Sequence, residues 1–304
     1  KAQGVHNVKS WSWLLKTIKQ YKKKKIHQDK TLLFSREKLF NFIVANADCL
    51  PELARLGVDV ELIVFSRCPM AYLQSIYAQI VKSDGYNKTI EEFVQANNYR
   101  IDLVKNMVNL IDKADSLHIP INIYNYSNRK KNLLSLVENH LDVPQGTLKP
   151  EKENMVINRS LTPDEVLLVR AFNKFLGEKA NKLIAKPLFT NLPELKAQKI
   201  KPEQKTLEKF ITNMNTDIDG FNQKYGYRFD AYDRLNADEV EGVKSPECAT
   251  LSPQQLEVVA SAMANHLKMQ QTPYTLKQTK LKRLKPKFSN KQMKLDNFNI
   301  LRNL

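Results

Sequence analysis

The stretch VELIVFSRCPMAYLQSIYAQIVK, residues 60–82, decides the fold that we expect for this chain. Val60 to Phe65 is largely apolar and rich in β-branched residues, which is typical of a strand buried on both faces of a parallel sheet. Arg67 follows this strand, and a turn at Cys68-Pro69 leads into a helix predicted from Met70 to Lys82. The sequence therefore predicts a strand–turn–helix unit that places Arg67 beside the start of a helix.

Arg67 and Ser75 form a pattern suited to binding a phosphate monoester. The guanidinium of an arginine contacts two phosphate oxygens at once, and a serine hydroxyl can contact a third. The start of the helix adds unpaired N–H groups and the positive end of the helix dipole. An ordinary strand–helix junction with a surface arginine and a capping serine explains the same residues, so both readings stay open at this stage.

The first half of the chain alternates between strand and helix patterns. Strands are predicted at Thr31 to Ser35, Val58 to Phe65 and Ile119 to Tyr126. This alternation indicates a three-layer α/β/α fold, with a central parallel sheet and helices on both faces. Ligands of such sheets bind at the carboxyl ends of the strands, so we expect the three strand ends to share one rim. Helices are predicted at residues 11–25, 37–44, 51–56, 70–82, 89–97, 99–116 and 131–140.

After Pro144 the strand pattern fades, and the rest of the chain is predicted to be helical. Thr162-Pro163 is a good helix start because threonine caps and proline suits the first helical position. Residues 186–201 read as an irregular basic stretch, and residues from 270 onward as a basic arm. We expect an α/β core over residues 1–185, a helical part packed on it over 186–269, and the arm over 270–304. The helices are predicted at residues 162–176, 203–225 and 254–269.

The chain of 304 residues is strongly basic, with a net charge of +16. Lys22 to Lys25 form one basic cluster, and residues 268–304 hold ten Lys or Arg against a single acid, Asp296. Such a surface attracts nucleotides, nucleic acids, anionic membranes or acidic glycans. A solvated tail with no partner is an equally good explanation of the last stretch.

The cysteines and histidines indicate neither a disulfide framework nor a metal site. The three cysteines are odd in number and far apart, and the five histidines form no HxxxH pair. We therefore expect a reducing compartment and no metal cofactor. No apolar run reaches the roughly 18–20 residues of a membrane span, and the first residues show no signal-peptide pattern. These features favour a cytoplasmic protein, with association at the inner face of the membrane as an open alternative.

Several landmarks in order resemble the bacterial branch of the sulfotransferase family, over about residues 32–177. The landmarks are LLFSREKLF (32–40), VFSRCPMAYLQSIYAQIVKS (64–83), EEFVQ (91–95), INIYNYS (121–127) and VINRSLTPDEVLLVRAFN (156–173). The resemblance implies a fold like that of P-loop nucleotide kinases. It also implies transfer of a sulfuryl group from 3′-phosphoadenosine-5′-phosphosulfate (PAPS) to a hydroxyl of a glycan, a glycolipid or a small metabolite. The basic surface suits an anionic acceptor such as an acidic polysaccharide.

The resemblance assigns cofactor-binding roles to five residues of this chain. Arg67 and Ser75 match the residues that hold the 3′-phosphate, and Tyr126 matches an aromatic residue that lines the adenine pocket. Ser35 follows the strand TLLFS and is expected to help hold the cofactor or the catalytic base. Ser160 belongs to an Asn-x-Ser-Leu landmark whose role we do not derive. A tyrosine at a sheet edge and a serine that caps the next helix are the open alternatives for Tyr126 and Ser160.

The acceptor hydroxyl needs a base, and Glu37 is the candidate. It stands where the resemblance places a His or Glu base, and partial burial would raise the pKa of a carboxyl enough to accept a proton. Glu37 could instead cap its helix or pair with Arg36. His6 is the second candidate base, although a histidine near a chain start is often structural.

One element of the resemblance is missing. Sulfotransferases bind the 5′-phosphosulfate with a Gly- and Lys-containing loop after their first strand, and Gly4 is the only glycine before Gly57. The first strand recognised here, Thr31 to Ser35, looks like the family's second. We expect the first strand and its loop to be absent from the chain given, or the protein to be a degenerate member of the family.

Two other functions remain in competition. A non-catalytic protein that binds nucleic acid or another polyanion would explain the charge, although no RNA-binding motif is present. A P-loop kinase-like transferase would need a phosphate-binding loop and a magnesium-binding acid, and neither is visible in the sequence.

Overall fold

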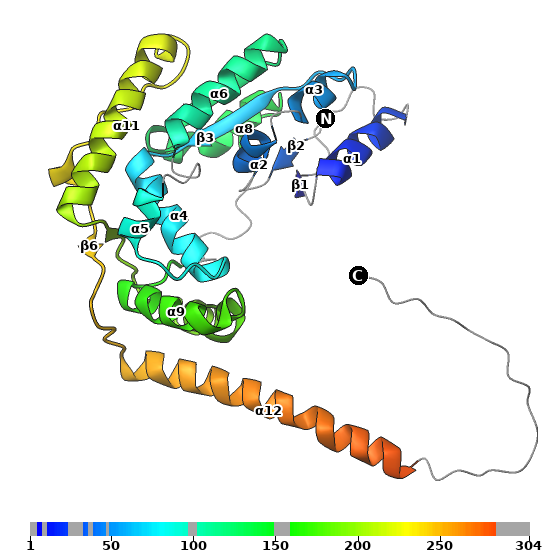
Figure 1. Ribbon diagram of the computed structural model, residues 1–304. Coiled ribbons are helices and arrows are strands. Elements are labelled where there is room, and N and C mark those ends of the chain that lie inside the picture. The colour runs from blue at the N-terminus through cyan, green and yellow to red at the C-terminus, as the bar shows by residue number, and fades with distance from the viewer. Residues whose placement is uncertain are drawn as a thin grey trace, which may run out of the picture.

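The computed structural model describes residues 5–7, 11–23, 33–35, 39–46, 49–96, 102–148 and 159–283. Within these residues the chain is a mixed α/β protein in which helices far outweigh strands (Figure 1). The strands pair in parallel, two at a time. They are β1 (Val5–Asn7), β2 (Leu33–Ser35), β3 (Leu62–Ser66), β4 (Ile121–Asn125), β5 (Ile200–Lys201) and β6 (Val243–Lys244).

The helices follow the predicted order, with two short additions at Tyr126–Arg129 and Lys186–Asn191. A π-helical turn at Asn181–Ala185 leads directly into α10. The α-helices are α1 (Trp11–Lys23), α2 (Leu39–Ala45), α3 (Cys49–Ala54), α4 (Pro69–Ser83), α5 (Ile90–Gln95), α6 (Leu103–Ser116), α7 (Tyr126–Arg129), α8 (Leu133–His140), α9 (Pro163–Leu176), α10 (Lys186–Asn191), α11 (Gln204–Tyr225) and α12 (Pro253–Arg283).

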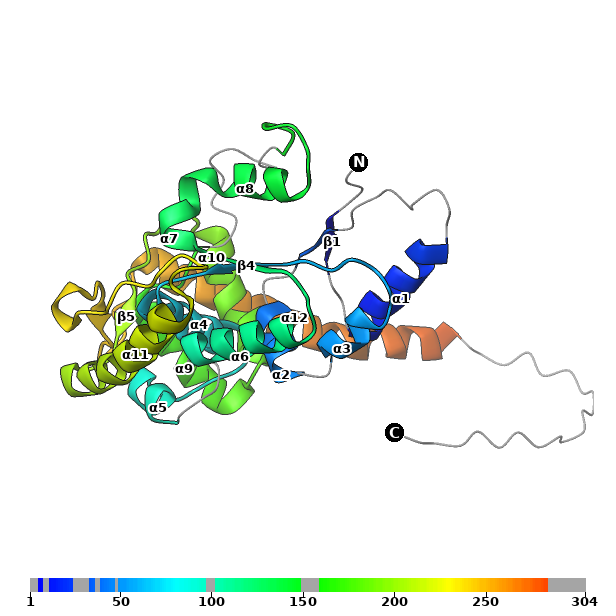
Figure 2. The ribbon, with the colours of Figure 1, turned by 90° about the horizontal axis from the view of Figure 1, so that it is seen from above.

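The β3–β4 pair forms the centre of the described fold. Leu62 pairs with Ile121 and Ser66 with Asn125, so the two carboxyl ends are level. Along β4 the side chains alternate between buried and half-buried, as a strand with two unlike faces requires. Seen nearly edge-on, the pair has α7 and α8 on one side and α4 and α6 on the other (Figure 2). Helices on both faces agree with the predicted layering, but the described strands form pairs only, so the wide central sheet stays a prediction.

A strand precedes the one that the sequence pattern shows first. β1 pairs in parallel with β2, with Val5 opposite Leu33 and Asn7 opposite Ser35. The sequence pattern, in which Thr31 to Ser35 is the first recognisable strand, therefore missed β1. Three residues that include His6 and Asn7 carry no alternating apolar pattern, so periodicity could not find β1. The chain passes from β1 to α1 through residues 8–10, which lie outside the described residues.

One lysine of the basic cluster has a structural partner. Lys22 lies in α1, and its Nζ donates to the carbonyl oxygens of Leu56 and Gly57. These carbonyls follow α3, where a cation offsets the negative end of the helix dipole. Gly57 has a positive φ of 57°, a conformation that glycine adopts without strain. Lys22 thus fastens α1 to the end of α3.

The predicted helix starts at Thr89 and Thr162 are confirmed. Each threonine accepts a hydrogen bond from the N–H of a glutamate three residues later, Glu92 or Glu165, and each glutamate accepts one from the threonine N–H. This reciprocal arrangement is the capping box. Both helices therefore begin where local chemistry dictates.

Two predictions about the C-terminal half were wrong. Residues 186–201 are not irregular throughout, because α10 begins at Lys186. α12 does not end near residue 269 but continues to Arg283, so the first part of the predicted arm is helical. The Gln, Leu, Lys and Arg residues of this stretch have good helix propensity, whereas Pro273 and three threonines do not, so the sequence pattern indicated an earlier end.

A single hydrophobic cluster spans the described chain from Leu14 of α1 to Val259 of α12. Its largest fully buried side chains include Tyr77 of α4, Phe93 of α5 and Phe221 of α11. Residues 186–269 therefore share a core with the residues before them. Cys49, Cys68 and Cys248 form no disulfide with one another in the described part of the chain. Among the described residues, no helix has both the length and the apolar content that a membrane span requires.

Candidate functional site

The carboxyl ends of β3 and β4 bring two predicted site residues together. Arg67 follows Ser66 of β3 and is exposed, and Tyr126 follows Asn125 of β4. The guanidinium carbon of Arg67 lies over the Tyr126 ring, 5.3 Å from its centroid. A cation over an aromatic face at this distance is an attractive contact. Because β3 and β4 are parallel and level, the residues that follow them meet at one edge of the pair.

The helix after Arg67 begins without a side-chain cap. Pro69 occupies the first position of α4, and Cys68 takes the cap position with no side-chain hydrogen bond. Such a helix start presents N–H groups next to Arg67. Ser75 lies further along α4 and is exposed. Arg67 and Ser75 thus belong to one strand–helix unit, and the described hydrogen bonds include none between them.

The other predicted site residues are placed less completely. Ser35 ends β2 opposite Asn7, and His6 lies in β1 opposite Phe34. Their side chains and the whole of Glu37 lie outside what the structure describes. Ser160 is exposed, and its carbonyl oxygen accepts a hydrogen bond of 3.0 Å from Arg159. Among the predicted site residues whose side chains the structure describes, Arg67 and Tyr126 are in contact.

A loop from the C-terminal half supports the end of β4. The Asp230 carboxylate accepts hydrogen bonds from the Asn125 N–H at 3.1 Å and from Arg129 Nε and Nη2 at 3.1 and 2.9 Å. These bonds, with Arg129 as the largest contributor, hold the pKa of Asp230 below its usual value. Arg129 and Asp230 thereby fix the short helix α7 that begins with Tyr126. Sequence reasoning missed both residues, because 101 positions separate them.

The same loop reaches the end of β3. The Tyr232 hydroxyl and Ser66 Oγ form a hydrogen bond, and both side chains are buried. Burial raises the pKa of Tyr232 to about 12, so the phenol stays protonated and donates to Ser66. Tyr232 therefore anchors the backbone immediately before Arg67.

A hydrogen-bonded chain of three side chains links Glu61, which precedes β3, to Tyr124 of β4. His140 of α8 contacts the Tyr124 hydroxyl through Nε2 at 2.8 Å and Glu61 Oε1 through Nδ1 at 2.9 Å. The carboxylate accepts from Nδ1–H, which leaves Nε2 to accept from the tyrosine. Burial raises the pKa of Tyr124. The three residues are far apart in the sequence, at positions 61, 124 and 140, so only the fold brings them together.

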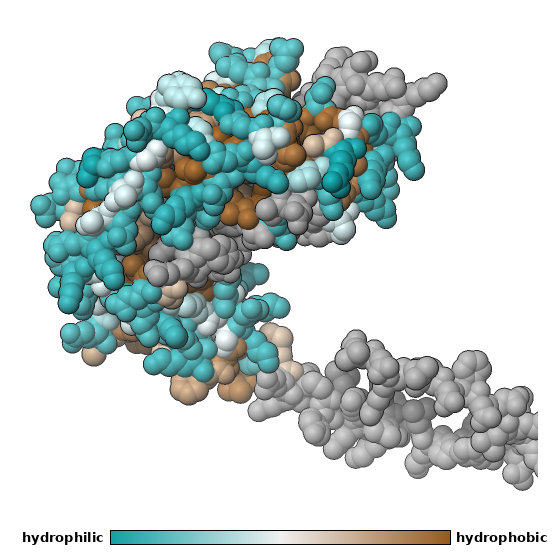
Figure 3. Space-filling model, turned by 45° about the horizontal axis from the view of Figure 1, so that its top comes forward, coloured by the Kyte–Doolittle hydropathy of each residue, from teal (hydrophilic) through white to brown (hydrophobic). Residues whose placement is uncertain are grey.

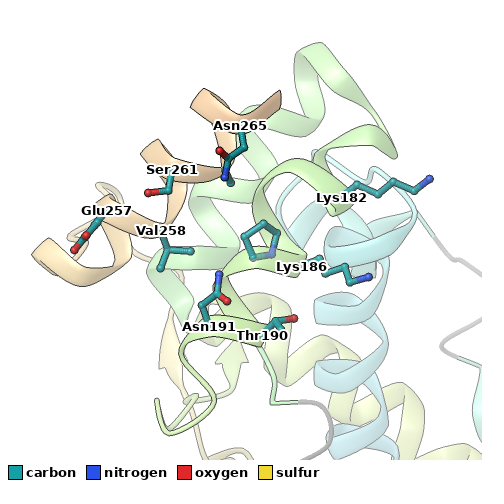
Figure 4. Close-up of a pocket in the computed structure, with 10 residues that line it drawn as sticks. Lys182, Lys186, Thr190, Asn191, Glu257, Val258, Ser261 and Asn265 are labelled. Carbon is teal, nitrogen blue, oxygen red and sulfur yellow. The ribbon is translucent and has the colours of Figure 1, made fainter. Parts of the chain in front are cut away.

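Among the described residues, neither a cluster of metal ligands nor either of the two surface pockets below involves the residues at the carboxyl ends of β3 and β4. In the part of the chain that the structure describes, no three His, Cys, Asp or Glu side chains gather as metal ligands. One surface pocket of about 450 Å³ lies between α10 and α12, where Lys182 and Lys186 extend away from the α12 side (Figure 4). A second of about 490 Å³ lies on α1 and is lined by Ser12, Leu15, Lys16, Lys19, Gln20 and Lys23.

Comparisons with known proteins find no similarity. No protein-family model matches the chain, and no curated protein or solved structure matches it significantly. The interpretation of the site therefore rests on the residues and their geometry.

Proposed function

We propose that the chain binds a 3′-phosphorylated adenosine nucleotide at the carboxyl ends of β3 and β4 and acts as a PAPS-dependent sulfotransferase. One observation carries this proposal. The guanidinium carbon of Arg67 lies 5.3 Å from the centroid of the Tyr126 ring, and the two residues follow neighbouring parallel strands. The arginine supplies a charged fork for phosphate, and the tyrosine supplies an aromatic face for a base. Ser75 and the uncapped start of α4 add further donors on the same unit.

The chemistry requires positioning more than a covalent intermediate. The donor supplies a sulfuryl group, which passes to the acceptor hydroxyl while 3′-phosphoadenosine-5′-phosphate leaves and the hydroxyl loses its proton. Residues of the chain hold the two reactants in line and offset the developing negative charge. In this scheme Arg67 and Ser75 bind the 3′-phosphate, and Glu37, with His6 as the alternative, accepts the proton.

The wider fold is part of the proposal. In it the β1–β2 and β3–β4 pairs belong to one P-loop-like three-layer fold, so all four carboxyl ends face one rim. β1 supports this arrangement because it supplies a strand directly before a helix, where such folds bind phosphate.

The acceptor is proposed to be an anionic glycan. Lys16, Lys19 and Lys23 line one pocket on α1, spaced as residues on one helix face. A row of exposed cations on α1 would hold an acidic polysaccharide by its negative charge.

Calorimetric binding of 3′-phosphoadenosine-5′-phosphate, beside 5′-AMP, tests the proposal directly. The two ligands differ in the 3′-phosphate, so a strong preference for the first supports a 3′-phosphate site. Equal binding of both nucleotides, or binding of neither, removes the basis for the sulfotransferase assignment.

The net charge of +16 favours one alternative, a non-catalytic polyanion-binding protein. Truncation after Met269 separates the two functions, because it removes most of the basic residues of the last stretch. The alternative is supported if the truncated protein loses polyanion binding and the full chain shows no preference for the 3′-phosphorylated nucleotide. Nucleotide preference that survives the truncation supports the enzyme.

A further inference from the structure

One face of α12 packs against the rest of the protein. Ser252 and Gln255 cap the helix reciprocally, with N–H to side-chain bonds of 2.8 and 3.2 Å. Gln255 is buried and donates to Glu165, and Val259 is buried in the core. Val258 faces the groove beside α10 (Figure 4). This face fastens the first half of α12 to α9 and α10.

A second face of α12 carries exposed apolar side chains. Leu256, Met263 and Leu267 are 54, 41 and 56% exposed, at spacings of seven and four residues. These spacings place all three on one side of the helix. Apolar side chains gather at the lower edge of the molecule, where the chain continues into its grey segment (Figure 3). Exposed apolar side chains aligned along one helix face, here called the stripe, are typical of an interaction surface.

The stripe leads into the most basic part of the chain. Residues 268–304 hold ten Lys or Arg and one acid. The occupant of the stripe must therefore offer both an apolar surface and negative charge. A second copy would bring two equally basic helices together, and the phosphate backbone of a nucleic acid would leave the leucines and methionine without a partner. An anionic lipid surface satisfies both requirements.

We propose that α12 docks on an anionic lipid bilayer as an interfacial helix. Leu256, Met263 and Leu267 enter the boundary between headgroups and acyl chains, and the net positive charge of the sequence from residue 268 onward attracts the anionic surface. A helix of 31 residues is about 46 Å long. It runs beyond the body of the protein, so it can lie along a surface without the body intervening (Figure 1). Binding of this kind is reversible and weakened by salt.

Vesicle flotation of the full chain tests the proposal. The vesicles are phosphatidylcholine alone or an equal mixture of phosphatidylcholine and phosphatidylserine. We expect binding to the mixed vesicles only, and weaker binding as salt rises. The triple variant Leu256→Ser, Met263→Ser, Leu267→Ser is expected to bind about tenfold more weakly or worse, because it removes three apolar side chains from the interface.

A matched control replaces three exposed apolar residues elsewhere: Leu134→Ser, Phe175→Ser, Tyr227→Ser. This control is expected to bind like the wild type, and circular dichroism checks that both triple variants keep their helices. Equal binding of the stripe variant and the wild type overturns the proposal, as does equal binding to both kinds of vesicle. A stripe-dependent dimer in sedimentation, or binding to RNA without binding to vesicles, also overturns it and assigns α12 to the other occupant.

Discussion

Arg159 and Glu165 form a buried ion pair in which two N–H groups of the guanidinium donate to the two carboxylate oxygens, at 2.7 and 2.8 Å. Arg159 also donates to the carbonyl oxygens of Leu188 and Leu192, and Gln255 donates to Glu165. The pair therefore joins the start of α9 to α10 and α12. Each partner is satisfied, as a buried charge must be.

We expect Glu165→Ala to lower the free energy of unfolding by about 3–5 kcal/mol, because it leaves a buried guanidinium without its counter-charge. Chemical denaturation measures the change. The control Glu194→Ala removes an exposed glutamate and is expected to change stability by less than about 0.5 kcal/mol. Equal effects of the two substitutions would show that the pair contributes nothing beyond a surface charge.

The same carboxyl predicts an acid-sensitive fold. Burial favours its neutral form, but hydrogen bonds from Arg159, Gln255 and the Thr162 N–H outweigh burial, so its folded-state pKa lies below 4.5. A depressed pKa contributes stability above the unfolded value, and this contribution is lost as pH falls through the folded value. Unfolding measured from neutral pH to below 4.5 should therefore show a shallower loss of stability in Glu165→Gln than in the wild type. Parallel pH profiles would contradict this.

The sequence predicted those parts of the fold that local chemistry determines. The apolar run before Arg67 and the capping boxes at Thr89 and Thr162 define their elements without help from distant residues. β1 and α10 escaped prediction because their few residues carry no period, and they form against partners far along the chain. Whether the strand pairs belong to one sheet also depends on tertiary contacts, which the sequence pattern does not reveal.

The candidate site was predictable only in its strand-end residues. Parallel strands bring residues that follow them to one edge, which is why Arg67 and Tyr126 could be expected together. Asp230 and Tyr232 come from a loop after α11 that carries no motif, and they reach the strand ends only through packing. No sequence pattern in β3 or β4 indicates that residues of this loop contact their ends.

Tyr232→Phe should destabilise the protein by about 1–3 kcal/mol, because it leaves the buried Ser66 hydroxyl without its partner. Thermal or chemical unfolding measures the loss. Combining it with Ser66→Ala removes both hydrogen-bonding groups, so the double variant should lose less than the two single losses added together. Strict additivity would mean that the two hydroxyls do not interact.

His140 should be found as the Nδ1–H tautomer, because Glu61 accepts from Nδ1 and Tyr124 donates to Nε2. Nitrogen–proton correlation spectra of the imidazole distinguish the two tautomers. Exposed His118 serves as an internal control and is expected to show the mixture typical of a solvated histidine. Glu61→Gln should shift His140 toward that mixture, and an Nε2–H tautomer in the wild type would rule out the hydrogen-bonded chain.

Arg67→Ala should weaken binding of 3′-phosphoadenosine-5′-phosphate by about tenfold to hundredfold, because it removes a charged fork from the 3′-phosphate. Arg67→Lys keeps the charge but not the fork, so it should recover only part of the affinity. Tyr126→Leu should weaken 5′-AMP and the 3′-phosphorylated nucleotide alike, since it acts on the base and on the position of Arg67.

Arg55→Ala is the matched control, because Arg55 is also exposed but precedes β3 at its opposite end. It removes the same charge and is expected to leave affinity unchanged, which separates a local site from general electrostatic attraction. If Arg55→Ala and Arg67→Ala weaken binding equally, the nucleotide responds to net charge and the strand ends form no specific site. If only Arg67→Ala weakens binding, and only binding of the 3′-phosphorylated ligand, the guanidinium of Arg67 recognises the 3′-phosphate.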